Sequence, residues 1–195
     1  PDALDRGYNG ANRVVAVLDS GIERSHPFLR GFVGEACFSD ECPNGDSSQV
    51  GLGAAAACTF SSRCDHGTHV SGIAIGIPQV GSTDAPGVGS GAKLMPINVF
   101  SPIEGSTCEA RGQSSPCLTS YTSDLLAALQ YVFGKRNTYP LSAVNMSLGG
   151  GKHTNFCDDS DLKPIIDHLR SVGIATVIAS GNNGYLNAIS AGLVD

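Results

Sequence analysis

The sequence predicts an α/β fold in which a mostly parallel sheet carries helices on both faces. Four short segments rich in Val and Ile are apolar nearly throughout, which is typical of strands buried on both faces. Three segments with helical spacing of their apolar residues alternate with these strands along the chain. Repeated strand–helix alternation favours parallel pairing, and 195 residues suit one such domain.

The four strand segments end close to glycines or small polar residues. The second contains Pro96, which cannot donate a backbone hydrogen bond and is unusual inside a sheet. The predicted strands are "RVVAVL" (13–18), "KLMPINVF" (93–100), "SAVNMSL" (142–148) and "IATVIA" (174–179).

The three helices are predicted from apolar residues at i, i+3, i+4 and i+7. The first follows "DHGTHVSG". The second begins behind Thr122 or Ser123 and ends at Gly134, and the third has Ser160 as its N-cap and Gly173 as its stop. The expected buried positions are Val70, Ile73, Ala74 and Ile77 in the first, Leu125, Ala128, Leu129 and Val132 in the second, and Leu162, Ile165, Ile166 and Leu169 in the third.

Composition argues against two classes of partner. The net charge is −6 and lysine and arginine form no cluster, whereas a nucleic-acid reader normally presents a basic patch. No apolar run approaches the roughly 20 residues that cross a membrane. We therefore expect neither nucleic acid nor membrane as a partner.

The seven cysteines fall mainly in polar segments that read as loops. Such spacings indicate disulfides and an oxidising compartment, whereas zinc knuckles of the CxxC type are absent from the sequence. Cys108 and Cys117 are predicted to close a local loop, and Cys157 is the candidate for the unpaired thiol. The protein is expected to be secreted. Because "PDALDRGYNGANR" lacks the features of a signal peptide, a leader is expected outside this chain.

Polar residues follow three of the predicted strands, and a histidine begins the first helix. Parallel sheets bind ligands at the carboxyl ends of their strands, so these residues are expected to meet at one edge. They are Asp19 in "LDSG", His66 in "DHGTHVSG", Ser147, Gly149 and Gly150 in "NMSLGG", and Gly181, Asn182 and Asn183 in "ASGNNG".

Each feature also has a simpler interpretation. Asp19, "SLGG" and "GNNG" are compatible with ordinary turns. "HGTH" could bind a metal, but Gly67 and Thr68 are poor helix formers and the glutamate of an HExxH motif is absent. His69 is expected to be a buried, hydrogen-bonded side chain beside Ile73. A nucleotide-binding module lacks support, because the sequence contains neither GxGxxG nor a P-loop.

Acid–base chemistry explains more of these residues together. A buried carboxylate, Asp19, could orient His66, which would then take a proton from a hydroxyl nucleophile. The side-chain amide of Asn182 suits an oxyanion that forms when a carbonyl is attacked. "SLGG" could pair with an extended peptide as an added strand. This is the layout of an acyl-transfer hydrolase.

Four motifs in this order resemble the leading blocks of the subtilisin-like serine proteases (subtilases): "VAVLDSGIERSHPFL", "DHGTHVSGIAIG", "VNMSLGGG" and "IASGNNG". The resemblance runs from about Gly7 to Asn187 and is most similar to the secreted bacterial type. It implies a three-layer fold, a serine endopeptidase and an extended polypeptide substrate. It also implies Asp19 as triad acid, His66 as base, Asn182 as oxyanion donor, Ser147, Leu148 and Gly149 on one side of the S1 cleft, Ser180 and Gly181 opposite, and a second substrate strand near Ser120 and Tyr121.

The resemblance stops before the nucleophile. Subtilases carry it in a "GTSMA"-like block, and this chain contains no Gly-Thr-Ser. We therefore expect residues 1–195 to form a single, incomplete catalytic domain whose C-terminal part lies outside this chain. That part would supply the serine and a partner for Cys157, and the isolated chain would be inactive. The alternative is a catalytically dead protein that binds extended peptides. The family resemblance allows calcium, but no calcium loop can be identified, so neither cofactor nor metal is assigned.

Overall fold

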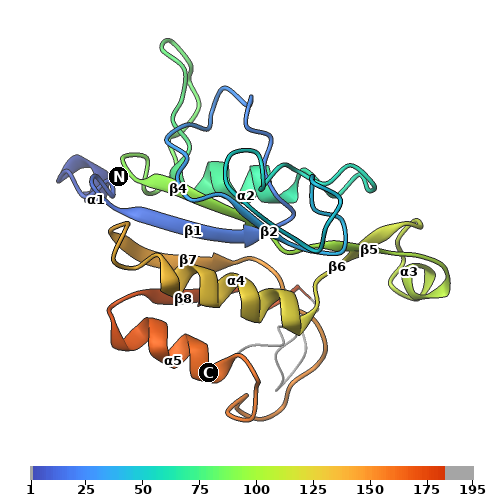
Figure 1. The fold of residues 1–195 in the computed structure, drawn as a ribbon. Helices are drawn as coiled ribbons and strands as arrows, with labels where there is room; N and C mark the ends of the chain where they lie inside the picture. Colours follow the sequence, from blue (N-terminus) through green and yellow to red (C-terminus); the bar gives the residue numbers. More distant parts are fainter. Residues whose placement is uncertain (1, 183–195) are drawn as a thin grey trace.

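A computed structural model describes residues 2–182 and shows the predicted three-layer α/β architecture. A six-stranded sheet in the order β3-β2-β4-β1-β7-β8 forms the middle layer. Helix α2 covers one face, and α4 and α5 cover the other (Figure 1). All pairs in this sheet are parallel except β2 with β3. The fold class predicted from the sequence is therefore confirmed.

The four predicted strands are present, and four shorter strands accompany them. Strands β5 and β6 form a separate antiparallel hairpin. The strands are β1 Val14–Asp19, β2 Ala36–Phe38, β3 Ser48–Val50, β4 Lys93–Asn98, β5 Ser101–Ile103, β6 Cys117–Thr119, β7 Leu141–Met146 and β8 Ala175–Ile178.

Pro96 lies inside β4, opposite Val17 of β1, although prolines are normally excluded from central strands. The amide of Leu94 donates to Gly31 O, and Leu94 O accepts from the amide of Val33. Because successive residues alternate in direction, the nitrogen of Pro96 faces the same side. On that side, Pro96 lies between two pairings of β4, the Phe32–Leu94 bridge and the Ala36–Ile97 pair of β2. The missing N–H of Pro96 therefore interrupts no hydrogen bond between strands.

The three predicted helices are also present. All the apolar residues that the spacing predicted for the two helices on the α4–α5 face are buried, although Leu162 lies at the N-cap position of α5 and not inside it. Gly173 has a φ of 80°, a left-handed conformation that favours glycine, and it follows α5 as predicted. The helices are α1 Asp2–Asp5, α2 His66–Ile75, α3 Ser106–Ala110, α4 Thr122–Gly134 and α5 Lys163–Ser171.

Two helical predictions are wrong in detail. Ser160 is not the N-cap of α5, because its hydroxyl accepts from the amide of Leu162, one residue ahead of the helix. In α2 the buried residues are Gly67, Ser71 and Ile75, and Ile73 is 57% exposed. Val70 and Ala74 pack partly buried against the core, as predicted, but the centre of the buried face is the Gly67, Ser71 and Ile75 row, which includes two small residues that apolar spacing does not register.

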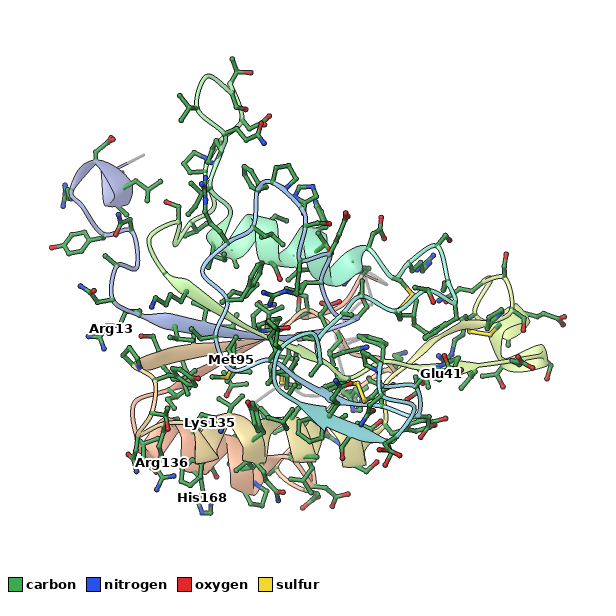
Figure 2. All side chains as sticks on the ribbon, turned by 45° about the horizontal axis from the view of Figure 1, so that its top comes forward. Arg13, Glu41, Met95, Lys135, Arg136 and His168 are labelled. Atoms are coloured by element: carbon green, nitrogen blue, oxygen red, sulfur yellow. A yellow bond between two sulfur atoms is a disulfide. The ribbon has the colours of Figure 1, made fainter. Side chains whose placement is uncertain are left out.

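The larger core cluster lies between the sheet and the α4–α5 layer. It includes Met95, Leu129 and Met146, which are all fully buried. Figure 2 shows Met95 inside the molecule, whereas Lys135, Arg136 and His168 lie at the outer side of the helices. There the guanidinium of Arg136 stacks 4.1 Å from the centroid of the Phe133 ring and covers this partly buried aromatic.

The opposite face of the sheet is only half covered. Helix α2 packs on β1 and β4. Beyond it, Ala175 and Val177 of β8 are exposed, Val177 by 54%. Within residues 2–182, no helix covers this side of β7 and β8. Parallel strands are normally buried on both faces, so this apolar surface is unusual.

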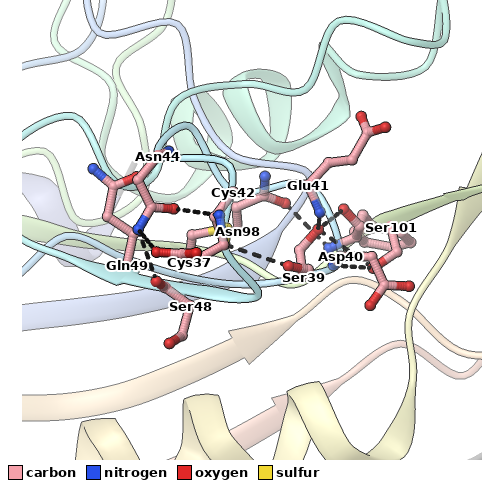
Figure 3. Close-up of a disulfide and its surroundings, with 12 residues drawn as sticks. Cys37, Ser39, Asp40, Glu41, Cys42, Asn44, Ser48, Gln49, Asn98 and Ser101 are labelled. Atoms are coloured by element: carbon pink, nitrogen blue, oxygen red, sulfur yellow. Dashed lines mark hydrogen bonds between the residues drawn. A yellow bond between two sulfur atoms is a disulfide. The ribbon is translucent and has the colours of Figure 1, made fainter.

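Three disulfides pair six of the seven cysteines, and Cys157 is the free thiol, as predicted. The predicted Cys108–Cys117 bridge is present and closes the loop between β5 and β6. Cys37–Cys42 closes the turn after β2, where Figure 3 shows the surrounding hydrogen bonds. In this turn the hydroxyl of Ser39 donates to Phe100 O at 2.8 Å, which ties the turn to the segment between β4 and β5.

An ion pair fixes the segment that precedes β2. Glu35 is 5% exposed, and its carboxylate binds the guanidinium of Arg24 and accepts from the amide of Gly53 at 2.8 Å. The pair therefore links the loop after β1 to the loop after β3. Removing one partner of a buried ion pair lowers the stability of the fold, because the remaining charge is left without a partner.

We expect Glu35→Gln to lower the free energy of unfolding by about 1–3 kcal/mol, which is less than for a fully buried pair because Arg24 is partly exposed. Urea unfolding followed by circular dichroism measures this loss. Asp158→Asn is the matched control, since Asp158 lies 3.8 Å from Lys163 on the surface and should matter by less than about 0.5 kcal/mol. Equal effects of the two substitutions would contradict the prediction.

Candidate active site

A carboxylate and an imidazole meet at the carboxyl edge of the sheet. Asp19 is the last residue of β1, and His66 is the first residue of α2. His66 Nδ1 lies 2.8 Å from Asp19 Oδ1. Because a carboxylate can only accept, Nδ1 carries the proton, and in the neutral ring Nε2 is left as the basic atom.

The carboxylate of Asp19 is held in a buried position. Its side chain is 2% exposed, and its Oδ1 also accepts from the amide of Ser20 at 2.7 Å. Its Oδ2 has no hydrogen-bond partner within residues 2–182. Charge on a buried carboxylate is stabilised only by such donors and by an opposite charge nearby. Protonation of His66 therefore stabilises the buried charge of Asp19 by placing a positive charge beside it.

The hydrogen bond to Asp19 raises the pKa of His66 above its ordinary value of 6.5. Partial burial acts in the opposite direction, while the charges of Asp19 and Asp65 add to the rise and that of Arg63 opposes it. The side chain of His66 remains 48% exposed. This combination of a carboxylate-bound Nδ1 and an accessible ring is what a general base requires.

Two glycines let the strand end and the helix approach closely. A side chain at Gly67 would place a Cβ 2.2 Å from Gly21 O and 3.1 Å from Asp19 Cβ. Gly21 has a φ of 84°, and a Cβ there would lie 2.3 Å from Ala56 O. The glycines of "DSG" and "HGT" are therefore required by contact between these segments.

Asp19 and His66 line a cavity of about 1450 Å³ together with three of the predicted substrate-binding residues. Ser147, Leu148 and Gly149 follow β7 and form part of its wall. Ser120 also lines the cavity. The structure therefore brings the first, second and third motifs together at one edge, as the topology predicted.

The described part of the fourth motif, "IASGNNG", lies at the same sheet edge but outside the cavity wall. Ser180, Gly181 and Asn182 come directly after β8, whose Ile178 pairs with Met146 of β7. They therefore follow the same sheet edge, but none of the three lines the cavity among the described residues. Tyr121 is likewise absent from this wall. Asn183 lies outside the described residues.

His69 is not the buried, hydrogen-bonded side chain that the sequence predicted. It is exposed, and it lines the cavity one turn after His66. The reason is the rotation of α2: Gly67, Ser71 and Ile75 turn to the sheet, so His69 turns to solvent. No group of three His, Cys, Asp or Glu side chains suited to a metal ion occurs within residues 2–182.

Sequence reasoning also missed one wall of the cavity. Arg111 and Gln113, just after α3, and Leu118 of β6 line it from the disulfide-closed hairpin. The guanidinium of Arg111 donates to Leu118 O at 3.3 Å, which braces this wall. Only the predicted Cys108–Cys117 bridge signalled that this insert is ordered.

Comparisons with known proteins identify the family of this chain. The model of the subtilase family (peptidase S8) matches residues 10–194. The chain belongs to the subtilase family. It is 30% identical to subtilisin E of Bacillus subtilis over 192 residues, covering 97% of this chain and 39% of subtilisin E. It is also 30% identical to bacillopeptidase F of the same species over 195 residues, covering 93% of this chain and 12% of that protein.

Solved structures show the same fold. Sphericase superimposes with a TM-score of 0.66 at 22% identity, covering 93% of this chain and 50% of sphericase. Fervidolysin from Fervidobacterium pennivorans gives a TM-score of 0.59 at 24% identity, with 94% and 23% covered. This subtilase chain therefore spans half or less of these relatives.

Within residues 2–182, no helix is long and apolar enough to cross a membrane.

We expect Gly67→Ala to lower the free energy of unfolding by about 1–3 kcal/mol, because α2 or the backbone at Gly21 must move. Thermal unfolding by calorimetry measures the loss. Gly72→Ala in the same helix is the control: its Cβ would meet only the Phe28 ring, at 3.4 Å, so better helix propensity should leave stability unchanged or higher. A Gly67→Ala protein as stable as Gly72→Ala would refute the close-approach argument.

We expect Asp19→Asn to lower the pKa of His66 toward 6.5, since it removes the main cause of the rise. A raised folded-state pKa stabilises the fold fully below the unfolded value, and this contribution disappears as pH rises through the folded value. The parent protein should therefore have a higher free energy of unfolding below the His66 pKa than above it. This difference should be smaller in Asp19→Asn.

The histidine ring signals in an NMR pH titration give the pKa, and urea unfolding on either side of that pKa gives the stability. Asp65→Asn is the control, because Asp65 acts on His66 through charge alone and should lower its pKa less. A larger effect of Asp65→Asn would contradict the assignment of Asp19 as the main partner.

Proposed function

We propose that residues 1–195 carry the acid–base part of a serine endopeptidase that cleaves extended polypeptides. The observation that supports this most directly is the 2.8 Å contact between His66 Nδ1 and Asp19 Oδ1 beside a large cavity. Membership of the subtilase family supports serine peptidase chemistry in general. The roles of single residues and the activity of the isolated chain are our proposals.

In the proposed mechanism, Nε2 of neutral His66 takes the proton of a serine hydroxyl as that oxygen attacks the peptide carbonyl. Asp19 holds the ring in the Nδ1–H form and stabilises the resulting imidazolium. The Asn182 amide donates to the oxyanion. His66 then passes its proton to the leaving amine, and water hydrolyses the acyl-enzyme with His66 again as the base. No step is assigned to a metal or cofactor.

Substrate binding is proposed to follow the strand ends. The backbone of Ser147, Leu148 and Gly149 would pair with the extended peptide from one side of the cavity. Ser180 and Gly181 would lie on the opposite side. The second substrate strand is proposed near Ser120, which lines the cavity beside β6.

The serine nucleophile is proposed to come from outside residues 1–195. The sequence contains no Gly-Thr-Ser, and within residues 2–182 the His66 ring hydrogen-bonds only Asp19. The uncovered apolar face of β7 and β8 supports a further part of the same domain as the partner that packs there. The relatives' greater length is consistent with such a part.

Secretion is proposed on two grounds. Three disulfides are typical of an oxidising compartment. A relative from Xanthomonas campestris that is 28% identical is named an extracellular protease.

A peptide-binding protein without catalysis remains the second candidate. It is favoured by a cavity whose "SLGG" wall is complete although none of the described serines hydrogen-bonds His66. Saturable binding of an extended peptide in calorimetry, without cleavage by any longer form of the protein, would support this candidate over the endopeptidase.

A fluorophosphonate probe, which labels activated serines, tests the proposed function. We expect no labelling of residues 1–195. A protein extended past Asp195 by the residues encoded downstream should be labelled stoichiometrically and should cleave casein. Its kcat/KM should rise with pH through the His66 pKa, above 6.5, because the neutral ring is the base.

In the extended protein, Asn182→Ala should lower kcat by about 10²–10³-fold, the range found for an oxyanion donor in another subtilase. Asn44→Ala, in the turn after β2, is the matched control and should leave kcat unchanged. Labelling of the isolated chain would refute the external nucleophile, and an extended protein that neither reacts nor cleaves would refute the endopeptidase.

A further inference from the structure

Ser20, directly after the catalytic-site aspartate, hydrogen-bonds Asp19 and two residues close to His66 in the sequence, Cys64 and Gly67. It is 1% exposed. Its amide donates to Asp19 Oδ1, the same oxygen that binds His66. Its hydroxyl accepts from the amide of Gly67 at 3.0 Å and donates to Cys64 O at 3.0 Å. One side chain thus links the strand end to both sides of His66.

The hydroxyl of Ser20 serves as the side-chain cap of α2. The amides in the first turn of a helix have no partner within the helix. Asp65, at the N-cap position, makes no capping hydrogen bond with its side chain. The amide of Gly67 is instead satisfied by Ser20 from the end of β1. Because the Ser20 hydroxyl donates its proton to Cys64 O and not to His66, Ser20 is not placed to act as the nucleophile.

A disulfide closes the loop that Ser20 holds. Cys58 and Cys64 are bonded to each other, and both ends of this loop reach Ser20. The amide of Cys58 donates to Ser20 O at 3.1 Å, and Cys64 O accepts from the Ser20 hydroxyl. Cys64 precedes His66 by two residues, so the disulfide limits how far the start of α2 can move from β1.

We propose that Ser20 is a positioning residue for the Asp19–His66 pair and that the Cys58–Cys64 disulfide holds the loop on which Ser20 acts. The inference rests on the proposed function, in which His66 is the base. Proton transfer requires heavy atoms within about 2.6–3.2 Å, and a displacement of about 1 Å can cost roughly 10²-fold in rate. Ser20 supports this geometry through its bonds to Asp19, Cys64 and Gly67.

The charges around His66 make the inference testable. Asp19 faces the ring from β1, and Asp65 and Arg63 act on it from the segment before α2. Replacing the Ser20 hydroxyl leaves all three charges in place. A change in the His66 pKa would therefore report altered geometry of the Asp19–His66 hydrogen bond.

Ser20→Ala in residues 1–195 is the first test, with the His66 pKa measured by NMR pH titration. His66→Gln identifies the signal among the five histidines. We expect the pKa to fall by about half a pH unit toward its ordinary value of about 6.5. Ser71→Ala is the matched control, since Ser71 is a buried serine of α2 whose hydroxyl has no partner among the described residues. Its His66 pKa should equal that of the parent.

The disulfide is tested by replacing both Cys58 and Cys64 with serine, which should also lower the His66 pKa. The control replaces Cys37 and Cys42, which close a loop of similar length after β2 and should leave the pKa unchanged. Ser20→Thr keeps the hydroxyl and should retain the parent pKa. If Ser20→Ala does not fold, Ser20→Thr and the disulfide variant decide the question.

An unchanged His66 pKa in folded Ser20→Ala, or in the Cys58/Cys64 variant when Ser20→Ala does not fold, overturns the inference. An equal fall in Ser71→Ala does so too. These titrations need no catalysis, so they are independent of the proposed function. An extended protein that cleaves no peptide would refute the endopeptidase and leave the positioning role intact. An active extended protein whose His66 pKa is unchanged by Ser20→Ala would refute only the positioning role.

Discussion

The hydrogen bond between His66 and Asp19 joins the end of the central strand to the first residue of α2, and the surrounding structure is arranged to permit it. Asp19 must be buried to reach the ring, and its charge then needs donors. The helix must come close to the strand, which only glycine allows at Gly67 and Gly21. The first two turns of α2 therefore bury the small residues Gly67 and Ser71, and this constraint also turns His69 into the cavity.

The sequence predicted best those elements whose stability comes from large apolar side chains. The residues that the spacing indicated for α4 and α5 are all buried, with Leu162 at the N-cap of α5, because Leu, Ile and Val against the sheet decide the orientation of these helices. Helix α2 follows a different rule: contact with β1, not apolar area, sets its rotation, so periodicity misplaced Ile73 and His69. The three-residue strands β2, β3, β5 and β6 are too short to show a pattern.

The site was predictable where it depends on topology. Parallel strands bring their carboxyl ends to one edge, so topology alone places Asp19 and "SLGG" together, and both line the cavity. The wall that contains Arg111 and Leu118 depends instead on how an insert folds over that edge. No rule of periodicity covers such an insert. The positioning role of Ser20 cannot be predicted from the sequence for a related reason: it depends on contacts with Cys64 and Gly67, 44 and 47 residues away.

The two faces of the sheet differ in how they are completed. The α4–α5 face forms a closed apolar core, whereas beside α2 the surface of β7 and β8 is uncovered in the described chain. Asp19 and His66 nevertheless adopt hydrogen-bonding geometry, because the ties that hold them come from β1, the loop before α2 and the Cys58–Cys64 bridge. The acid–base pair is thus ordered by contacts that do not involve the uncovered surface. Under the proposed function, a segment that packs on that surface would bring a nucleophile to a base that is already oriented, and little reorganisation would be needed at the moment of reaction.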